Sequence, residues 1–124
     1  MNGLDSSRPI YAQLAEDIVK RAVRGELKPG DRIPSAREFA QAQLVNPNTV
    51  VRAYQELERD QFIVTRRGLG SFLTNDPARI GAARDRLVGQ ATGRVMTELR
   101  ALGLSATECR AALDRALGGL AEPR

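Results

Sequence analysis

Residues 34–73 read PSAREFAQAQLVNPNTVVRAYQELERDQFIVTRRGLGSFL, a pattern that predicts two short helices, each with its own start signal. A pair of strands punctuated by glycine and carrying two adjacent arginines follows the helices. This is the order of a helix-turn-helix followed by a basic wing. It offers one helix to the major groove of DNA and an arginine-bearing loop to the neighbouring backbone or minor groove.

Two helix starts are visible in this segment. Ser35-Ala36-Arg37-Glu38 has the sequence of a capping box, with serine at the N-cap and glutamate three residues later. It predicts a helix as far as about Gln43, with Phe39 and Ala40 facing the core. Asn46-Pro47-Asn48-Thr49 opens the next helix, with asparagine as the N-cap and proline at the first helical position.

This second helix runs to about Asp60, and its two sides differ in character. One side is an apolar stripe formed by Val50, Ala53, Tyr54 and Leu57. The opposite side is polar and carries Asn48, Arg52, Gln55 and Arg59, with Thr49 and Val51 on the flanks. A core helix with a solvated outer face explains the same pattern, so this helix alone does not establish DNA binding.

The predicted strands are short and apolar. Phe62-Ile63-Val64 and Ser71-Phe72-Leu73 are joined by Arg66-Arg67-Gly68-Leu69-Gly70. The glycines permit positive φ angles and a tight turn. Two arginines at the tip of a hairpin either reach a ligand or remain solvated and protect an edge strand.

One helix precedes this segment, and two follow it. Residues 10–24 have apolar side chains at helical spacing, and Gly25 ends that helix. Asp76-Pro77 breaks the pattern after the wing. A helix over about 78–102 comes next, and a second capping box at Ser105 starts a last helix that ends at Gly118-Gly119.

The expected fold class is therefore mainly α with a small β wing. We expect residues 1–75 to form a winged helix-turn-helix DNA-binding domain and residues 76–124 to form a two-helix dimerisation element.

Composition narrows the class of function. One cysteine and no histidine argue against a disulfide framework, a zinc site and the commonest general base, so we expect no cofactor, no metal and no enzyme activity. No apolar run approaches the ~20 residues of a membrane span. The N-terminus lacks a secretory signal pattern, so we expect a cytoplasmic protein.

The charge pattern is compatible with a nucleic-acid partner. The net charge is +4, and 17 arginines stand against 2 lysines. Arginine makes planar bidentate contacts with phosphate and guanine, which suits a nucleic-acid binder. A GC-rich genome produces the same bias.

Several residue groups carry a family resemblance, and they occur in this order: Pro9-Ile10-Tyr11 and Gln13; Gly25-x-Leu27-x-Pro29-Gly30-Asp31-x-Ile33-Pro34-Ser35-x-Arg37; Thr49-Val50 and Ala53-Tyr54; Gly68-x-Gly70-Ser71-Phe72. Together they closely resemble the winged helix-turn-helix of the GntR family of bacterial transcription regulators, over roughly residues 8–73. The chain departs from the family pattern at Gln61, where glycine is usual.

Val45-Asn46-Pro47-Asn48-Thr49-Val50 and the short C-terminal extension resemble the YtrA branch of that family. The resemblance implies that the chain lacks a large effector-binding domain and dimerises through its two last helices. Members of this branch are often linked to ABC-transporter operons and cell-envelope stress.

Ten residues are candidates for contact with double-stranded DNA: Ser35 and Arg37 on the positioning helix, Asn46, Asn48, Thr49 and Arg52 on the recognition helix, and Arg66, Arg67, Gly68 and Gly70 on the wing. Asparagine bonds bidentately to adenine, threonine touches a thymine methyl, and arginine reaches guanine or phosphate. Ser35 and Asn46 are also expected to cap their helices. For at least one of the two wing arginines, the alternative to DNA contact is a structural role as a solvated side chain at the hairpin tip.

The two last helices each have a wide apolar side. We expect a homodimer interface that contains Leu87, Ala91, Val95, Leu99, Leu113 and Leu117. The alternative is that both helices fold back on their own domain. Cys109 lies in the apolar stripe of the last helix and is expected to be a small buried hydrophobe. The alternative, a redox-sensing thiol, needs an exposed, electropositive site.

The predicted function is a sequence-specific transcriptional regulator, a repressor, acting as a homodimer on an inverted-repeat operator, with a transporter operon as its target. One alternative is an architectural DNA-binding protein with little sequence preference, which would present mostly lysine and arginine to the groove. A protein–protein adaptor would not need Arg66-Arg67 beside glycines. The sequence identifies no operator and no effector ligand.

Overall fold

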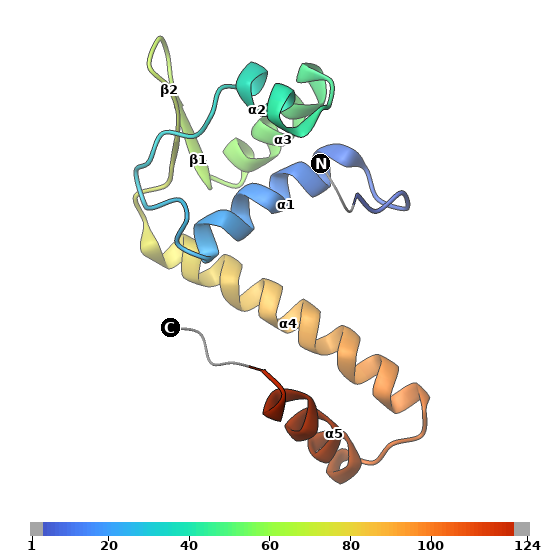
Figure 1. Ribbon diagram of the computed structural model, residues 1–124. Coiled ribbons are helices and arrows are strands. Elements are labelled where there is room, and N and C mark those ends of the chain that lie inside the picture. The colour runs from blue at the N-terminus through green and yellow to red at the C-terminus, as the bar shows by residue number, and fades with distance from the viewer. Residues whose placement is uncertain (1–3, 121–124) are drawn as a thin grey trace. The chain divides into compact units, whose positions relative to one another are not determined.

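The computed structural model describes residues 4–120 of the protein (Figure 1). The elements in these residues are α1 (Ile10–Val23), α2 (Ala36–Gln43), α3 (Pro47–Arg59), β1 (Ile63–Arg66), β2 (Gly70–Leu73), α4 (Pro77–Ala101) and α5 (Ala106–Gly118). The predicted fold class, mainly α with a small β wing, is confirmed. The chain divides inside α4, between Asp85 and Arg86, into an N-terminal and a C-terminal compact unit.

The helices of the helix-turn-helix begin at their predicted capping residues. Ser35 Oγ accepts a hydrogen bond from the backbone N–H of Glu38 (3.1 Å), and Asn46 Oδ1 accepts one from the N–H of Asn48 (2.8 Å). Each bond satisfies an amide that has no partner within its own helix. Pro47 occupies the first position of α3, where the missing N–H is not needed.

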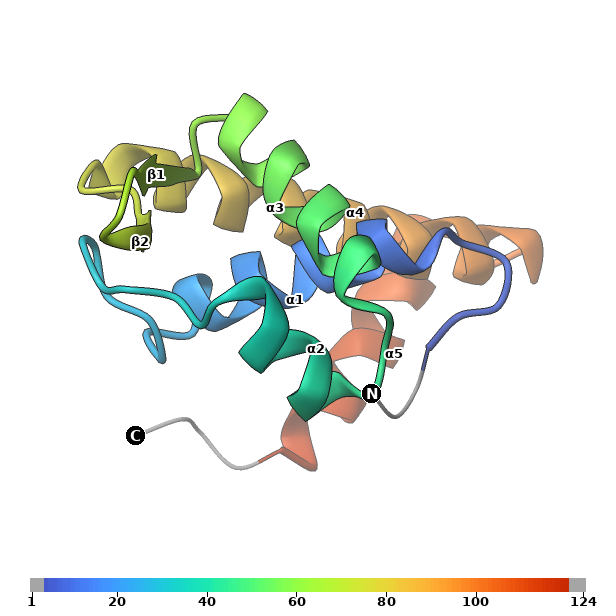
Figure 2. The same ribbon diagram turned by 90° about the horizontal axis from the view of Figure 1, so that it is seen from above.

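Three helices build most of the core of the N-terminal unit. α3 packs against both α1 and α2 (Figure 2). The apolar stripe predicted for α3 faces inward, with Val50, Ala53 and Leu57 buried. Tyr54 is half-buried, and its hydroxyl donates a hydrogen bond to the carbonyl oxygen of Pro34 (2.7 Å). Burial raises the pKa of Tyr54, so the phenol remains a donor at neutral pH.

The wing contains more than the two predicted strands. β1 and β2 pair in antiparallel fashion along their whole length. Arg32 forms an isolated bridge opposite Phe72, and the Ile33 N–H donates to the carbonyl oxygen of Ser71 (2.9 Å). The segment that leads into α2 therefore pairs with β2 over a short stretch, on the side opposite β1.

Three strand limits differ from the prediction: both ends of β1 and the start of β2. Phe62 lies before β1, because its N–H bonds to the carbonyl oxygen of Leu57 (2.8 Å) and completes the turn at the end of α3. Arg66 lies inside β1 and pairs with Gly70, so the loop of the wing is only residues 67–69.

The turn from α3 to β1 forms without the usual glycine. Gln61 adopts a left-handed backbone conformation, with φ of 59°. This conformation costs an ordinary residue roughly 1–2 kcal/mol. The Gln61 side chain accepts a hydrogen bond from Arg79 of α4 (2.6 Å), which ties the turn to the next helix.

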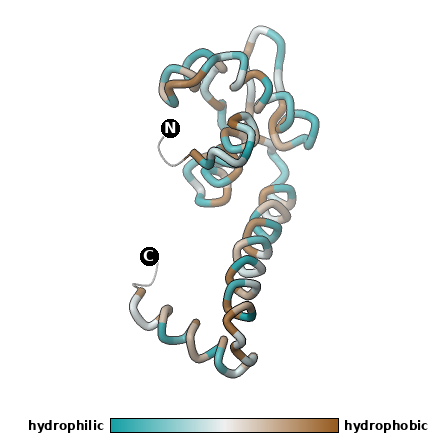
Figure 3. Tube along the Cα trace, turned by 90° about the vertical axis from the view of Figure 1, so that its right-hand side faces the viewer, coloured by the Kyte–Doolittle hydropathy of each residue, from teal (hydrophilic) through white to brown (hydrophobic). Residues whose placement is uncertain are grey.

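The C-terminal unit consists of α4 after Asp85 and of α5. Gly103, with φ of 83°, turns the chain between the two helices. Ser105 and Glu108 form the predicted capping box with both reciprocal bonds present. Cys109 is 2% exposed, which confirms its expected place as a buried small hydrophobe. Figure 3 shows apolar and polar residues interleaved along both helices.

Candidate nucleic-acid interface

The outer side of α3 is exposed on the N-terminal unit. Asn48 and Arg52, one helical turn apart, are exposed, and Gln55 and Arg59 continue this side toward the C-terminal end of the helix. Thr49 lies on the flank and is half-buried. The side of α3 that the core does not use therefore carries amide and guanidinium groups, which are the groups that read base edges.

The two candidates Ser35 and Asn46 use their side-chain oxygens as helix caps. Capping does not exclude a phosphate contact at Ser35, because the N-terminal turn of α2 still presents amide groups and carries the exposed Arg37. For Asn46 the cap uses one of the two lone pairs of Oδ1, so a bidentate contact with a base competes with the cap.

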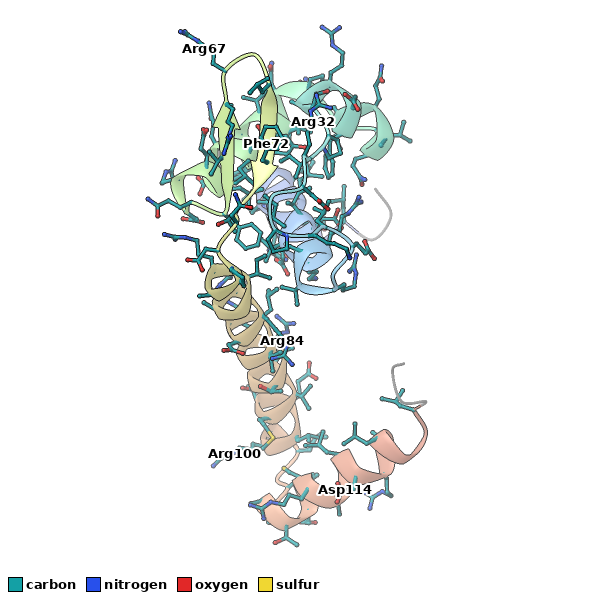
Figure 4. The ribbon with its side chains drawn as sticks, turned by 90° about the vertical axis from the view of Figure 1, so that its left-hand side faces the viewer. Arg32, Arg67, Phe72, Arg84, Arg100 and Asp114 are labelled. Carbon is teal, nitrogen blue, oxygen red and sulfur yellow. The ribbon has the colours of Figure 1, made fainter. Side chains whose placement is uncertain are left out.

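The tip of the wing is open around Gly68. Gly68 has a φ of 76°, and an added Cβ there would meet nothing within 4 Å. Arg67 extends from this tip, away from the rest of the N-terminal unit (Figure 4). Arg66 lies lower on the strand, with its Cζ atom 5.8 Å from the ring centroid of Phe72. The two neighbouring arginines therefore have different surroundings, because only Arg66 lies over an aromatic ring.

Gly70 has an internal reason to be glycine. Its φ is 113°, and an added Cβ would lie 2.9 Å from Nε of Arg32. The space beside Gly70 is therefore occupied by the Arg32 side chain, which brings a further arginine to the wing. Sequence reasoning missed Arg32, because its position beside β2 depends on a strand pairing between distant parts of the chain.

Ion pairing separates the arginines of the N-terminal unit into two sets. In residues 4–85, the arginines paired with a carboxylate are Arg8, Arg21, Arg24, Arg59, Arg79 and Arg84. Within residues 4–85, the remaining arginines form no ion pair with a carboxylate, and these are Arg32, Arg37, Arg52, Arg66 and Arg67. The unpaired set lies on α2, α3, the wing and the segment bonded to it. Positive charge without a protein counterion attracts phosphate.

The C-terminal unit presents an apolar groove. Ala91, Val95 and Leu113, three of the expected interface residues, line it together with Thr92 and Met96, and its volume is about 210 Å³. The other three expected residues, Leu87, Leu99 and Leu117, do not line this groove, and Leu117 is 61% exposed. Much apolar surface of the C-terminal unit is thus uncovered within the described chain.

Residues 4–120 hold no group of three or more histidine, cysteine, aspartate or glutamate side chains that is placed to bind a metal ion. Within the same residues, every helix is too short or too polar to cross a bilayer.

Comparison with known proteins settles the family. The family described as "Bacterial regulatory proteins, gntR family" matches residues 8–73, from the residue before Pro9 to the end of β2. The chain belongs to the GntR family. GntR proteins are transcriptional regulators with a winged helix-turn-helix, and the sequence-specific regulator predicted from the sequence is confirmed at that level.

Two GntR relatives come from Bacillus subtilis. The uncharacterized HTH-type transcriptional regulator YhcF is 41% identical over 107 residues, which cover 86% of this chain and 88% of YhcF. The HTH-type transcriptional repressor YtrA is 45% identical over 71 residues, which cover 57% of this chain and 55% of YtrA. These matches place the chain in the YtrA subfamily, as the sequence predicted.

Two solved structures extend the comparison. A GntR family transcriptional regulator from Listeria monocytogenes superposes with a TM-score of 0.85 at 37% identity, over 90% of this chain and 98% of that one. The DNA-binding domain of AraR in complex with operator ORX1 has a TM-score of 0.53 at 27% identity, over 60% of this chain and 90% of that one. The second structure shows a relative of this fold bound to its operator.

Proposed function

We propose that the protein is a cytoplasmic transcriptional repressor that binds an inverted-repeat operator as a homodimer. The observation that carries this proposal is the set of arginines without carboxylate partners, all of which lie on the helix-turn-helix and the wing or beside them. The proposed target, a transporter operon, rests on the resemblance to the YtrA branch. The similarity to YtrA, a repressor, supports repression over activation of the target genes.

In this proposal each element has its own role on DNA. Asn48 and Arg52 read base edges in the major groove, with Thr49 beside them against a thymine methyl. Arg37 and the first turn of α2 hold a phosphate. Arg67 enters the minor groove or contacts its backbone from the wing.

The C-terminal unit supplies the dimer. Val95, Leu113 and Leu117 are exposed by 39%, 36% and 61%, and a second copy covers such surface when two apolar grooves meet about a two-fold axis. The same axis repeats the recognition helix, and an inverted repeat presents the matching pair of half-sites.

Genome-wide mapping of DNA fragments protected by the protein, combined with transcript measurement after deletion of its gene, tests this function. We expect the protected fragments to share an inverted repeat next to an operon whose transcripts rise in the deletion strain. Protected fragments without a common sequence would instead support an architectural protein. Transcripts that fall on deletion would make the protein an activator.

A further inference from the structure

We propose that Tyr11 is a positioning residue for DNA recognition: its ring holds the guanidinium of Arg52 in place on the outer side of α3. The inference rests on the proposed function, since it names the residue that sets the geometry of one DNA-reading side chain. It concerns a contact between α1 and α3 that the family comparison does not assign.

The contact is the closest arginine–aromatic pair among the described residues. The Cζ atom of Arg52 lies 4.0 Å from the centroid of the Tyr11 ring. The pairs formed by Arg21 with Phe39 and by Arg66 with Phe72 are wider, at 5.6 and 5.8 Å. Arg52 forms no ion pair within residues 4–120, so the ring of Tyr11 is the group that fixes its cation there.

The ring belongs to a well-anchored part of α1. Gln13, two residues after Tyr11, is buried and bonds to the segment before the helix. Its side chain accepts from the N–H of Asp5 (2.7 Å) and donates to the carbonyl oxygens of Asp5 (2.5 Å) and Arg8 (3.0 Å). The first turn of α1, which carries Tyr11, is therefore tied to the segment that precedes the helix.

The physical consequence concerns the freedom of Arg52. A cation over the face of an aromatic ring leaves the N–H groups at the edge of the guanidinium available for two parallel hydrogen bonds. An arginine already held in one place loses less conformational entropy when it binds than a freely rotating one. Tyr11 thus raises the affinity and the selectivity of the base or phosphate contact that Arg52 makes.

The test is a double-mutant cycle on the full-length protein with a labelled DNA duplex that carries the selected operator. Tyr11→Leu removes the aromatic face, and we expect it to weaken operator binding about two- to five-fold, the weight of an exposed cation–π contact. Tyr11→Phe keeps the face and should bind within about two-fold of the unchanged protein. In an Arg52→Ala background, Tyr11→Leu should produce no further loss.

Each other result overturns the proposal. A loss with Tyr11→Phe as large as that with Tyr11→Leu would show that the hydroxyl contacts DNA itself. Equal losses in the two backgrounds would show that Tyr11 acts without Arg52. Unchanged binding by Tyr11→Leu would show that the ring does not position Arg52 for DNA, and tighter binding would show that the ring holds Arg52 away from DNA. Thermal unfolding of each variant corrects for the folded fraction, and Tyr11→Met replaces Tyr11→Leu if the latter does not fold.

A randomised-site selection separates this inference from the proposed function. Tyr11→Leu should relax the preference at the base position that Arg52→Ala also relaxes and should leave the other positions unchanged. If the unchanged protein itself selects no sequence, the proposed function fails. If it selects one and Tyr11→Leu selects the same one with the same stringency, only the role of Tyr11 fails.

Discussion

Asn46 and Asn48 are the same residue type, two positions apart, in different environments. Asn46 is committed to capping α3, whereas the side chain of Asn48 is exposed on the outer side of the first turn. We therefore propose a base-reading role for Asn48 and a mainly structural role for Asn46.

Asn48→Ala should weaken binding to the preferred site by about 1–3 kcal/mol and relax the selection at one base position, because a bidentate contact to adenine is lost. Asn46→Ala is the matched control. It should lower the free energy of unfolding by about 1 kcal/mol through loss of the cap, with base preference unchanged. Randomised-site selection and denaturant unfolding measure the two effects. An unchanged base preference in Asn48→Ala would mean that α3 docks in another way.

Arg67 should act as an anchor and not as a reader. Arg67→Ala should weaken binding to all DNA sequences to a similar extent, because one phosphate contact is lost. It should also reduce the slope of log affinity against log salt concentration by about one unit. Arg24→Ala is the control, since Arg24 is paired with Glu26 outside the helix-turn-helix and the wing. An effect of Arg67→Ala confined to a few sequences would show direct reading by the wing.

Residue roles that depend on local sequence were predictable, and those that depend on distant contacts were not. Ser35, Asn46 and Ser105 were recognised as caps because a capping bond spans only two or three residues. Two other contacts join segments that are far apart in the sequence, namely Arg52 with Tyr11 and Arg32 beside Gly70. No local sequence pattern predicts such contacts. Gly70 was a candidate DNA contact in the sequence, and the structure adds that an added Cβ there would lie 2.9 Å from Nε of Arg32.

At the level of elements, helices were predicted more accurately than the sheet. The limits of α2 and α3 follow from capping residues and apolar spacing, which are both local signals. The strand edge at Arg32 was missed because a single bridge residue has no alternation to detect. Arg66 was assigned to the loop, whereas β1 continues two residues beyond Val64 and its Arg66 pairs with Gly70.

The turn between α3 and β1 gives a prediction at this scale. Because Gln61 has a left-handed conformation, Gln61→Ile should lower the free energy of unfolding, since a β-branched residue fits this region less well than glutamine does. Gln61→Gly should equal or exceed the stability of the unchanged protein, even though the bond from Arg79 is lost. Urea unfolding of both variants and of the unchanged protein measures the order of their stabilities. A stable Gln61→Ile variant would mean that the turn has another conformation.

At the level of the whole molecule, the exposed apolar surface of the C-terminal unit is the surface that the proposed homodimer would bury. Val95→Glu places a charge in the groove lined by Ala91 and Leu113 and should convert a dimer into a monomer at micromolar concentration. Gln90→Glu, an exposed position of α4 outside that lining, is the control and should leave the dimer intact. Sedimentation velocity distinguishes these states. A dimer in Val95→Glu would show that the subunits associate through another surface. A monomer in the unchanged protein would show that the chain does not dimerise at this concentration.

The central claim is that this chain selects one DNA sequence through α3 and its wing. The most direct test is the ratio of two dissociation constants measured at the same salt concentration, one for a shuffled duplex and one for the selected inverted repeat. We expect the inverted repeat to bind at least about 10³-fold more tightly, as specific protein–DNA complexes do. A ratio near one would contradict the claim and show a protein that binds DNA by charge alone.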